Sequence, residues 1–263
     1  MRPVTLLVLI TACGEVKSPL ADAPAAPGTD ATGDAASSAD AAVDAPPCAA
    51  GLFTRDATTE LLYQLNEATS TLVGDSSGHS RDGRFATVSS GPTWNDGKFG
   101  GALVFSGGAG FAGDRVDIPL SPAVAWASAF SVEAIIKPSA TDPDGIIVGM
   151  NPVFALWSAS GGKPYWRLNS SSANLFGAVL DPSRWSYVAA TYDGATMRVY
   201  VDGQLAGMQA QPSVVQSGPT VAYLGCAPND GCFGGALDEV RLSSTTLTPA
   251  AIASTAARAS ACE

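Results

Sequence analysis

The chain has 263 residues, of which 46% are hydrophobic, and its 14 basic and 24 acidic side chains give a formal net charge of −10. This length is enough for one large domain with a substantial core. The acidic balance, without a basic stripe, argues against nucleic acid and anionic lipid as direct partners. No apolar run approaches the roughly 20 residues of a membrane-spanning helix, so we expect membrane contact only through an N-terminal anchor.

Residues 1–13 have the features of an export signal. Arg2 precedes the short apolar run VTLLVLI, and small residues follow it, as they do at a signal cleavage site. The stretch from Ile10 to Cys13 also resembles the lipobox of bacterial lipoproteins, with Ile10 where leucine is commonest. The resemblance implies that Cys13 is lipidated and anchors an exported protein to the cell envelope. Ordinary signal cleavage followed by secretion is the alternative.

Residues 14–47 have the composition of a linker. Ala, Asp, Pro, Ser and Gly dominate this stretch, and it contains no aromatic residue. Such a segment cannot bury enough apolar area to offset the entropy lost on ordering. We therefore predict a disordered linker over 14–47 and a folded domain over 48–263.

Short alternating segments separated by turns follow from residue 51 onward. In FSVEAIIKP, residues 130–138, apolar side chains recur at every second position, and the Asp202-Gly203 pair between two such segments is a hairpin signal. The only helix that we predict begins after Thr248, which can cap it, with Pro249 at its first position. The pattern predicts an all-β, two-sheet antiparallel jelly-roll sandwich with a short C-terminal helix.

Several longer stretches carry a family resemblance. GPTWNDGKFGGALVFSG, AFSVEAIIKP, RWSYVAATYDGATMRVYVDGQLAG and FGGALDEVRLSSTTLTPAAIAS occur in this order. Together they resemble the bacterial laminin-G-like, concanavalin A-like jelly-roll domains, over about residues 51–262. The resemblance implies two packed antiparallel sheets with neighbouring termini.

Four cysteines remain after Cys13. An even number of cysteines in an exported chain suggests disulfides. Cys226 and Cys232 flank the turn-rich stretch APNDG, whereas Cys48 and Cys262 lie at the two ends of the folded region. Of the three possible pairings we expect Cys226–Cys232 with Cys48–Cys262, which suits neighbouring termini; other pairings or free thiols are the alternative.

Two adjacent acids stand in the strand-like stretch GGALDEVRL, residues 234–242. On a regular strand Asp238 would share one face with Val240 and Leu242, while Glu239 would lie on the opposite face. Two carboxyls that point in opposite directions cannot act together across one substrate, since retaining glycosidases need them about 5 Å apart. We therefore expect no catalytic pair here.

The family resemblance implies a second role for Asp238. A carboxylate on an apolar face needs backbone donors or a cation to offset its desolvation. Related domains often bind a structural calcium ion with an acid of this strand, completed by backbone carbonyls and by a group near the first strand, for which Glu67 and Asn66 are the local candidates. Calcium held by Asp238 and Glu67 is one hypothesis, and Asp238 accepting backbone hydrogen bonds is the other.

Trp157, Tyr165 and Trp166 are the candidate ligand-binding residues, because they flank a Gly/Ser-rich turn with Arg167, Asn169 and Asn174 beside them. Aromatic faces can stack on sugar rings, although packing within the sheet is the alternative. His79 is the only histidine, and no nucleophile motif accompanies it. We expect a monomeric, non-catalytic module that binds carbohydrate or a surface protein. A structural or adhesive role without a discrete ligand is the alternative, and a glycan-active enzyme is the third interpretation.

Overall fold

The computed structural model describes residues 48, 51–86, 91–108, 113–121, 123–124, 128–140, 144–159, 161–169, 174–213, 215–216 and 219–262. The chain divides into two units, residues 1–42 and 43–263, and all of the described residues belong to the second. The predicted signal over 1–13, with lipidation at Cys13, and the predicted linker over 14–47 lie outside the described residues.

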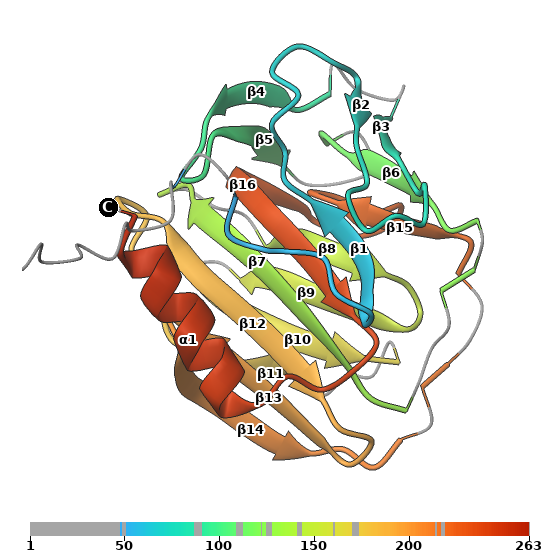
Figure 1. The fold of residues 1–263 in the computed structure, drawn as a ribbon, viewed down its shortest axis with the longest axis vertical. Coiled ribbons are helices and arrows are strands. Elements are labelled where there is room, and N and C mark those ends of the chain that lie inside the picture. The colour runs from blue at the N-terminus through green and yellow to red at the C-terminus, as the bar shows by residue number, and fades with distance from the viewer. Residues whose placement is uncertain are drawn as a thin grey trace, which may run out of the picture. The chain divides into compact units, whose positions relative to one another are not determined.

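The described residues form sixteen strands and one helix (Figure 1). The strands are β1 (Thr59–Tyr63), β2 (Leu72–Val73), β3 (Gly83–Phe85), β4 (Thr93–Asp96), β5 (Gly101–Gly108), β6 (Val116–Pro119), β7 (Phe130–Pro138), β8 (Gly145–Met150), β9 (Phe154–Ala159), β10 (Lys163–Leu168), β11 (Leu175–Phe176), β12 (Ser186–Tyr192), β13 (Thr196–Val201), β14 (Gln204–Ala210), β15 (Val221–Leu224) and β16 (Cys232–Ser243). The helix is α1 (Pro249–Ser260).

The strands build two layers that share one long strand. In what we call the first sheet the order is β14-β13-β12-β7-β16, and β16 pairs along its other side with β1 and β5, which pairs with β4. In the second sheet the order is β2-β3-β6-β15-β8-β9-β10-β11. A single parallel bridge between Cys232 and Ile146 connects the two layers, while the other pairings between the described strands are antiparallel. The predicted two-layer, all-β fold with one C-terminal helix is confirmed.

The main core lies between the two sheets. In β7 the alternation is as predicted: Phe130 and Val132 point into the core, whereas Ser131 and Ile135 do not. The ring of Phe130 contacts that of Trp166 in the opposite sheet, with 5.6 Å between ring centroids. Period-two alternation along each strand therefore determines which side chains fill the sandwich.

Helix α1 covers the outer face of the first sheet. Its N-terminus is capped as predicted, because the Thr248 hydroxyl accepts a hydrogen bond from the Ala251 amide and Pro249 occupies the first turn. Ile252 buries its side chain in a second apolar cluster with Phe53 and Tyr187. No helix among the described residues lies over the outer face of the second sheet (Figure 1). A smaller apolar cluster that includes Trp157, Tyr165 and Ala227 lies on that face.

Both expected disulfides are present. Cys48–Cys262 joins the start of the folded unit to the end of α1, with the two Cα atoms 5.6 Å apart. Cys226–Cys232 closes the loop between β15 and β16, with the two Cα atoms 4.2 Å apart. Two disulfides are typical of a protein exported to an oxidising compartment. Within the described part of the chain, no helix has the length and apolar character needed to cross a membrane.

We expect the terminal disulfide to stabilise the domain more than the short one does. Cys48–Cys262 spans 214 residues of sequence and Cys226–Cys232 spans 6. Loop-closure entropy gives about 5 kcal/mol for the long loop and about 2 kcal/mol for the short one. In thermal melts, Cys48→Ser/Cys262→Ser should therefore lower Tm by about 10–20 °C and Cys226→Ser/Cys232→Ser by less. An equal or larger loss in the second variant would contradict this ranking.

Candidate functional site

A β-bulge in β16 decides where the two acids point. The register of β16 against β7 shifts between Asp238 and Val240, and Glu239 adopts a positive φ of 48°. The extra residue turns Glu239 to the same side as Asp238, which is the outer face of the first sheet beneath α1. The prediction that the two acids point in opposite directions, with Asp238 on the core face, was wrong because it assumed a regular strand. The bulge lets Leu237, Val240 and Leu242 all reach the main core.

Both acids are fully buried and hold neighbouring segments of the chain. Asp238 Oδ2 accepts hydrogen bonds from the amides of Lys98 and Phe99, each at 2.8 Å, and Glu239 Oε2 accepts one from the Phe53 amide at 3.2 Å. Burial raises the pKa of each carboxyl to about 7, while the amide donors oppose the shift. The pair is therefore closed to solvent and fastens residues 97–101 and 51–54 onto the sheet.

A third buried acid sits beside this pair. Glu133, directly across from Arg241 in the register of β7 and β16, forms an ion pair with that guanidinium at 2.6 Å. The Tyr187 hydroxyl donates a second hydrogen bond to Glu133, and Arg241 lies over the Phe53 ring, 4.9 Å from its centroid. Burial raises the pKa of Glu133, and the charge of Arg241 opposes that rise. These contacts stabilise the layer between the first sheet and α1.

The residues of the calcium hypothesis are held by backbone amides. Glu67 Oε1 accepts a hydrogen bond from the Gly74 amide at 2.8 Å, and the Asn66 side chain accepts one from the Gly101 amide. Glu67 Oε2 and Asp238 Oδ1 are buried without a hydrogen-bond partner among the described residues. A bound cation is one way to satisfy such oxygens. However, those residues contain no group of three or more His, Cys, Asp or Glu side chains able to hold one ion. Calcium at Asp238 would thus depend on backbone carbonyls, and it stays a prediction.

Trp166 is a core residue and not a ligand contact. Its side chain is fully buried, and its ring stacks on that of Phe154 with 5.4 Å between centroids. Neighbouring residues of a strand point to opposite faces, so Tyr165 and Trp166 on β10 cannot contribute to one platform. The prediction of a site containing both was wrong for this reason.

Trp157 and Tyr165 lie together on the outer face of the second sheet. Their rings stack with centroids 5.5 Å apart, and Tyr165 also contacts Phe176, 5.2 Å away. The three rings come from β9, β10 and β11, at positions directly opposite one another in the register. Trp157 is 6% exposed and Tyr165 is 3% exposed, whereas Phe176 is 46% exposed. Burial and the charge of Asp144 raise the pKa of the Tyr165 hydroxyl, which therefore stays protonated.

Arg167 and Asn174 complete this surface. The Arg167 guanidinium carbon lies 4.9 Å from the centroid of Trp157 and 5.8 Å from that of Tyr165, and its Nε donates a hydrogen bond to Asn174 Oδ1 at 3.2 Å. Cation–π contact and the amide together hold the guanidinium at the surface. We call Trp157, Tyr165, Phe176, Arg167 and Asn174 the aromatic face.

Asn169, the other polar side chain beside the candidate aromatics, is used differently. Its Oδ1 accepts a hydrogen bond from the Gln216 amide at 3.0 Å, and its φ is 53°. It therefore holds a turn and is not part of the aromatic face.

The short disulfide borders the aromatic face. Ala227, next to Cys226, packs in one cluster with Trp157 and Tyr165. The disulfide leaves no room for a side chain at Gly113, because a Cβ there would lie 2.2 Å from the sulfur of Cys232. The bridge thus positions both the loop after β15 and the segment that leads into β6.

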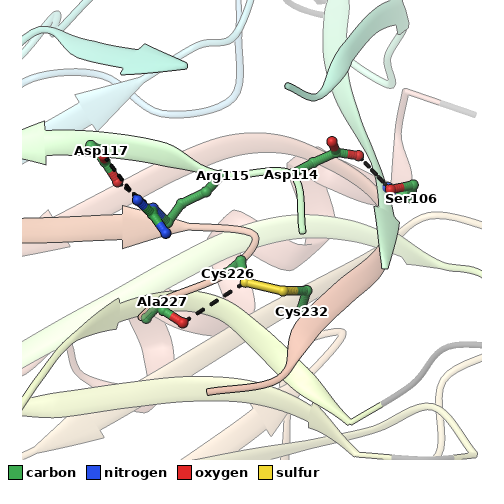
Figure 2. Close-up of a disulfide and its surroundings, with 7 residues drawn as sticks. All are labelled: Ser106, Asp114, Arg115, Asp117, Cys226, Ala227 and Cys232. Atoms are coloured by element: carbon green, nitrogen blue, oxygen red, sulfur yellow. Dashed lines mark hydrogen bonds and ion pairs between the residues drawn. A yellow bond between two sulfur atoms is a disulfide. The ribbon is translucent and has the colours of Figure 1, made fainter. Parts of the chain in front are cut away.

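Two polar pairs lie on the segment that passes the disulfide. Figure 2 shows Arg115 turned toward Asp117, and Asp114 bonded to Ser106. Arg115 also lies over the Tyr223 ring, with 5.6 Å to its centroid. These contacts satisfy the largely buried side chains of Asp114 and Arg115.

Sequence reasoning missed Phe176, the most exposed ring of the aromatic face. The stretch LFGAV reads as a strand, but nothing in it marks Phe176 as a surface residue. The one usable signal is that Asn174, directly before β11, and Phe176 are two positions apart, a spacing that places side chains on one side of an extended chain. Arg115 and Tyr223 were missed because only tertiary structure brings β6 and β15 together.

The family model for laminin-G-like domains, described as the concanavalin A-like lectin/glucanases superfamily, matches residues 107–253, more than half of the chain. The chain belongs to this superfamily. Members of the superfamily thus share the two-sheet fold described above. Comparison with curated proteins found no similar sequence.

Several solved structures share the fold. Domain 4 of AbnA, a GH43 extracellular arabinanase from Geobacillus stearothermophilus in complex with arabinotriose, is 19% identical, with a TM-score of 0.58 over 76% of this chain and 98% of that domain. The binding domain of botulinum neurotoxin DC in complex with SialylT is 14% identical, with a TM-score of 0.58 over 77% of this chain and 51% of that one. The same toxin domain with rat synaptotagmin II is 15% identical, with a TM-score of 0.59 over 77% and 52%. The superfamily member therefore spans about half the length of the toxin domains, and at these identities the likeness shows the fold alone.

We expect the domain to be more stable at pH 5 than at pH 8 in chelator. Burial raises the pKa of Asp238 from 3.8, and that of Glu239 from 4.5, to about 7. At pH values between the ordinary and the raised pKa, the folded protein therefore binds more protons than the unfolded chain does. The stability from these groups is present below about pH 4 and is lost as pH rises through about 7. At roughly 1.4 kcal/mol per pKa unit, Tm should fall by several degrees.

Circular dichroism melts across this range measure the effect. Glu239→Gln should flatten the dependence of Tm on pH. Asp181→Asn is the control, because hydrogen bonds from Ser183 lower the pKa of this exposed carboxyl, so that it titrates below pH 4. The change of Tm between pH 5 and pH 8 should therefore be the same in Asp181→Asn as in the wild-type protein. A Tm that rises between pH 5 and pH 8 would contradict the raised pKa values of Asp238 and Glu239.

The calcium hypothesis predicts that calcium raises Tm relative to EDTA, because an ion bound only by the folded state stabilises it. The quantity to compare is the difference in Tm between calcium and EDTA. Asp238→Asn should abolish this difference, and Glu67→Gln should reduce it. Asp117→Asn, at an acid of the second sheet, is the matched control. Equal melting temperatures in calcium and in EDTA would argue against the site.

Proposed function

We propose that this protein is an exported, lipid-anchored binding module without catalytic activity, and that carbohydrate binds on its aromatic face. The observation that carries this proposal is the exposed ring of Phe176 at the end of a row of contacting rings with Tyr165 and Trp157. Arg167 and Asn174 lie beside this row. Sugar rings present apolar C–H faces and a rim of hydroxyls. Aromatic rings next to an amide and a guanidinium match both features.

The structural relatives support a ligand of this kind. Domain 4 of the arabinanase is seen with arabinotriose and the botulinum toxin binding domain with SialylT, and both share the two-sheet fold of this chain. A protein is the alternative ligand, since the same toxin domain is also seen with rat synaptotagmin II. We place the carbohydrate first because stacked rings and polar side chains meet on one sheet face.

A binding role is favoured over hydrolysis by the location of the paired acids. Asp238 and Glu239 are fully buried, and backbone amides engage both. A glycosidase needs two carboxyls exposed to the scissile bond. The acid pair thus supports a structural role within a non-catalytic module.

The sequence and the disulfides support export and anchoring. The stretch ending at Cys13 resembles a lipobox, and the disulfides suit an oxidising compartment. A lipid on Cys13, followed by the Pro- and Asp-rich residues 14–47, would hold the domain at a distance from the envelope as a monomer. Secretion after ordinary cleavage is the alternative.

A protein surface is the second candidate ligand, and one observation favours it. Exposed apolar side chains occur at Phe176 and Val179, 46% and 60% exposed, and at Leu205 and Met208, 52% and 61% exposed. They belong to β11, the segment after it and β14, and these two strands lie side by side. Exposed apolar side chains grouped in this way mark interaction surfaces. A purely adhesive role would use the same patch without a saturable small ligand.

A glycan-array screen of the full chain, followed by calorimetry on the glycans that bind, tests the proposal. We expect Phe176→Ala to weaken glycan binding about tenfold, because it removes the most exposed ring, and to leave Tm nearly unchanged. Val179→Ala is the matched control, since it removes apolar surface outside the ring row.

Four outcomes of this experiment contradict the proposal. Absence of saturable glycan binding, or binding that survives Phe176→Ala, would remove the aromatic face as a sugar site. Equal losses of glycan affinity in Phe176→Ala and Val179→Ala would show no specific role for the ring row and would favour the exposed apolar patch around Phe176 and Val179 as the interaction surface. Release of shorter sugars from a bound glycan would show catalysis.

A further inference from the structure

A pocket of about 320 Å³ lies on the other side of the molecule from the aromatic face, between α1, the start of β12 and the turn that joins β13 to β14. Lys98, Arg184, Trp185, Asp202 and Gln204 supply its polar and aromatic lining. Its volume is in the range of small-molecule sites. None of these side chains takes part in the aromatic face.

The pocket exists because the helix presents only small side chains to it. Ala253, Ala256 and Ala257 line the helical wall, so that no side chain extends into the space. Opposite them is Gly203, where a Cβ would lie 2.7 Å from the Cβ of Ala256. The helix cannot settle further onto the sheet, because its buried residue Ile252 already contacts the apolar cluster beneath and Cys48–Cys262 fastens its end. The space is therefore preformed.

The polar wall is rigid and remains open to solvent. Asp202 lies in the hairpin turn with a φ of 48°; its Oδ1 accepts a hydrogen bond from the Tyr187 amide at 2.9 Å and its Oδ2 pairs with Arg184 at 2.7 Å. The side chains of Arg184 and Asp202 are still 48% and 35% exposed. A fixed donor and a fixed acceptor thus stand next to the half-buried indole of Trp185.

We propose that this pocket binds a single pyranose sugar unit. The indole of Trp185 offers an apolar surface to one face of the ring. Arg184 and Asp202 offer a charged donor and a charged acceptor to neighbouring hydroxyls, which both donate and accept, and charge-assisted hydrogen bonds are the stronger kind. Gln204 and Lys98 reach the remaining rim of the pocket. This site is separate from the aromatic face and does not depend on the function proposed for that face.

Nuclear magnetic resonance titration of the full chain with methyl glycosides of glucose, galactose, mannose and N-acetylglucosamine tests the site. We expect at least one glycoside to shift the Trp185 indole N–H and the Gly203 amide resonances saturably. Ala253→Leu fills the pocket from an exposed helix position and should weaken that glycoside at least tenfold. Ala251→Leu adds the same side chain to the same helix outside the pocket and should leave the affinity unchanged.

Sugar binding in the pocket can be distinguished from sugar binding on the aromatic face. Phe176→Ala should leave the shifts at Trp185 and Gly203 intact. The proposal is overturned when no glycoside shifts these two resonances saturably, or when Ala253→Leu binds as tightly as the wild-type protein. Binding that is lost in Phe176→Ala but kept in Ala253→Leu would assign the sugar to the aromatic face and would also overturn the pocket.

Discussion

The bulge at Asp238 and Glu239 is the constraint on which much of this structure depends. β16 is the most widely paired strand, with β7 along one side and β1 and β5 along the other. One extra residue lets the apolar side chains on both sides of the bulge reach the core, while both acids turn outward. A regular strand would have placed one carboxylate in the middle of the sandwich, where its desolvation would have had no compensation.

The outward acids then organise the layer above the first sheet. Their carboxylates accept backbone amides from residues that are distant in sequence, Phe53 at the start of the domain and Phe99 in the turn before β5. Those phenylalanines pack against the sheet, and α1 closes over the same cluster. Polar groups that resemble a catalytic pair in the sequence therefore act as anchors, because the amides and the surrounding apolar side chains exclude solvent.

As a consequence, the outer faces of the two sheets have different roles. The outer face of the first sheet is covered by α1 and the N-terminal segment, and alanines of α1 together with Gly203 leave a pocket beside Trp185. The second sheet has no helix over it among the described residues, so its outward side chains form the aromatic face. The short disulfide borders that face and holds the adjoining loop, whose Ala227 packs in one cluster with Trp157 and Tyr165.

Local signals in the sequence determined much of the fold. Alternation in residues 130–138, the Asp202-Gly203 turn, the Thr248-Pro249 helix start and the spacing of the four cysteines all act over short distances or through composition, and each appears in the structure as expected. Only the tertiary structure decided the bulge at Glu239, the burial of Trp166 and the meeting of Phe176 with Trp157 and Tyr165. Register and bulges follow from pairing with strands far away in the sequence, and a shift of one residue exchanges the two faces of a strand.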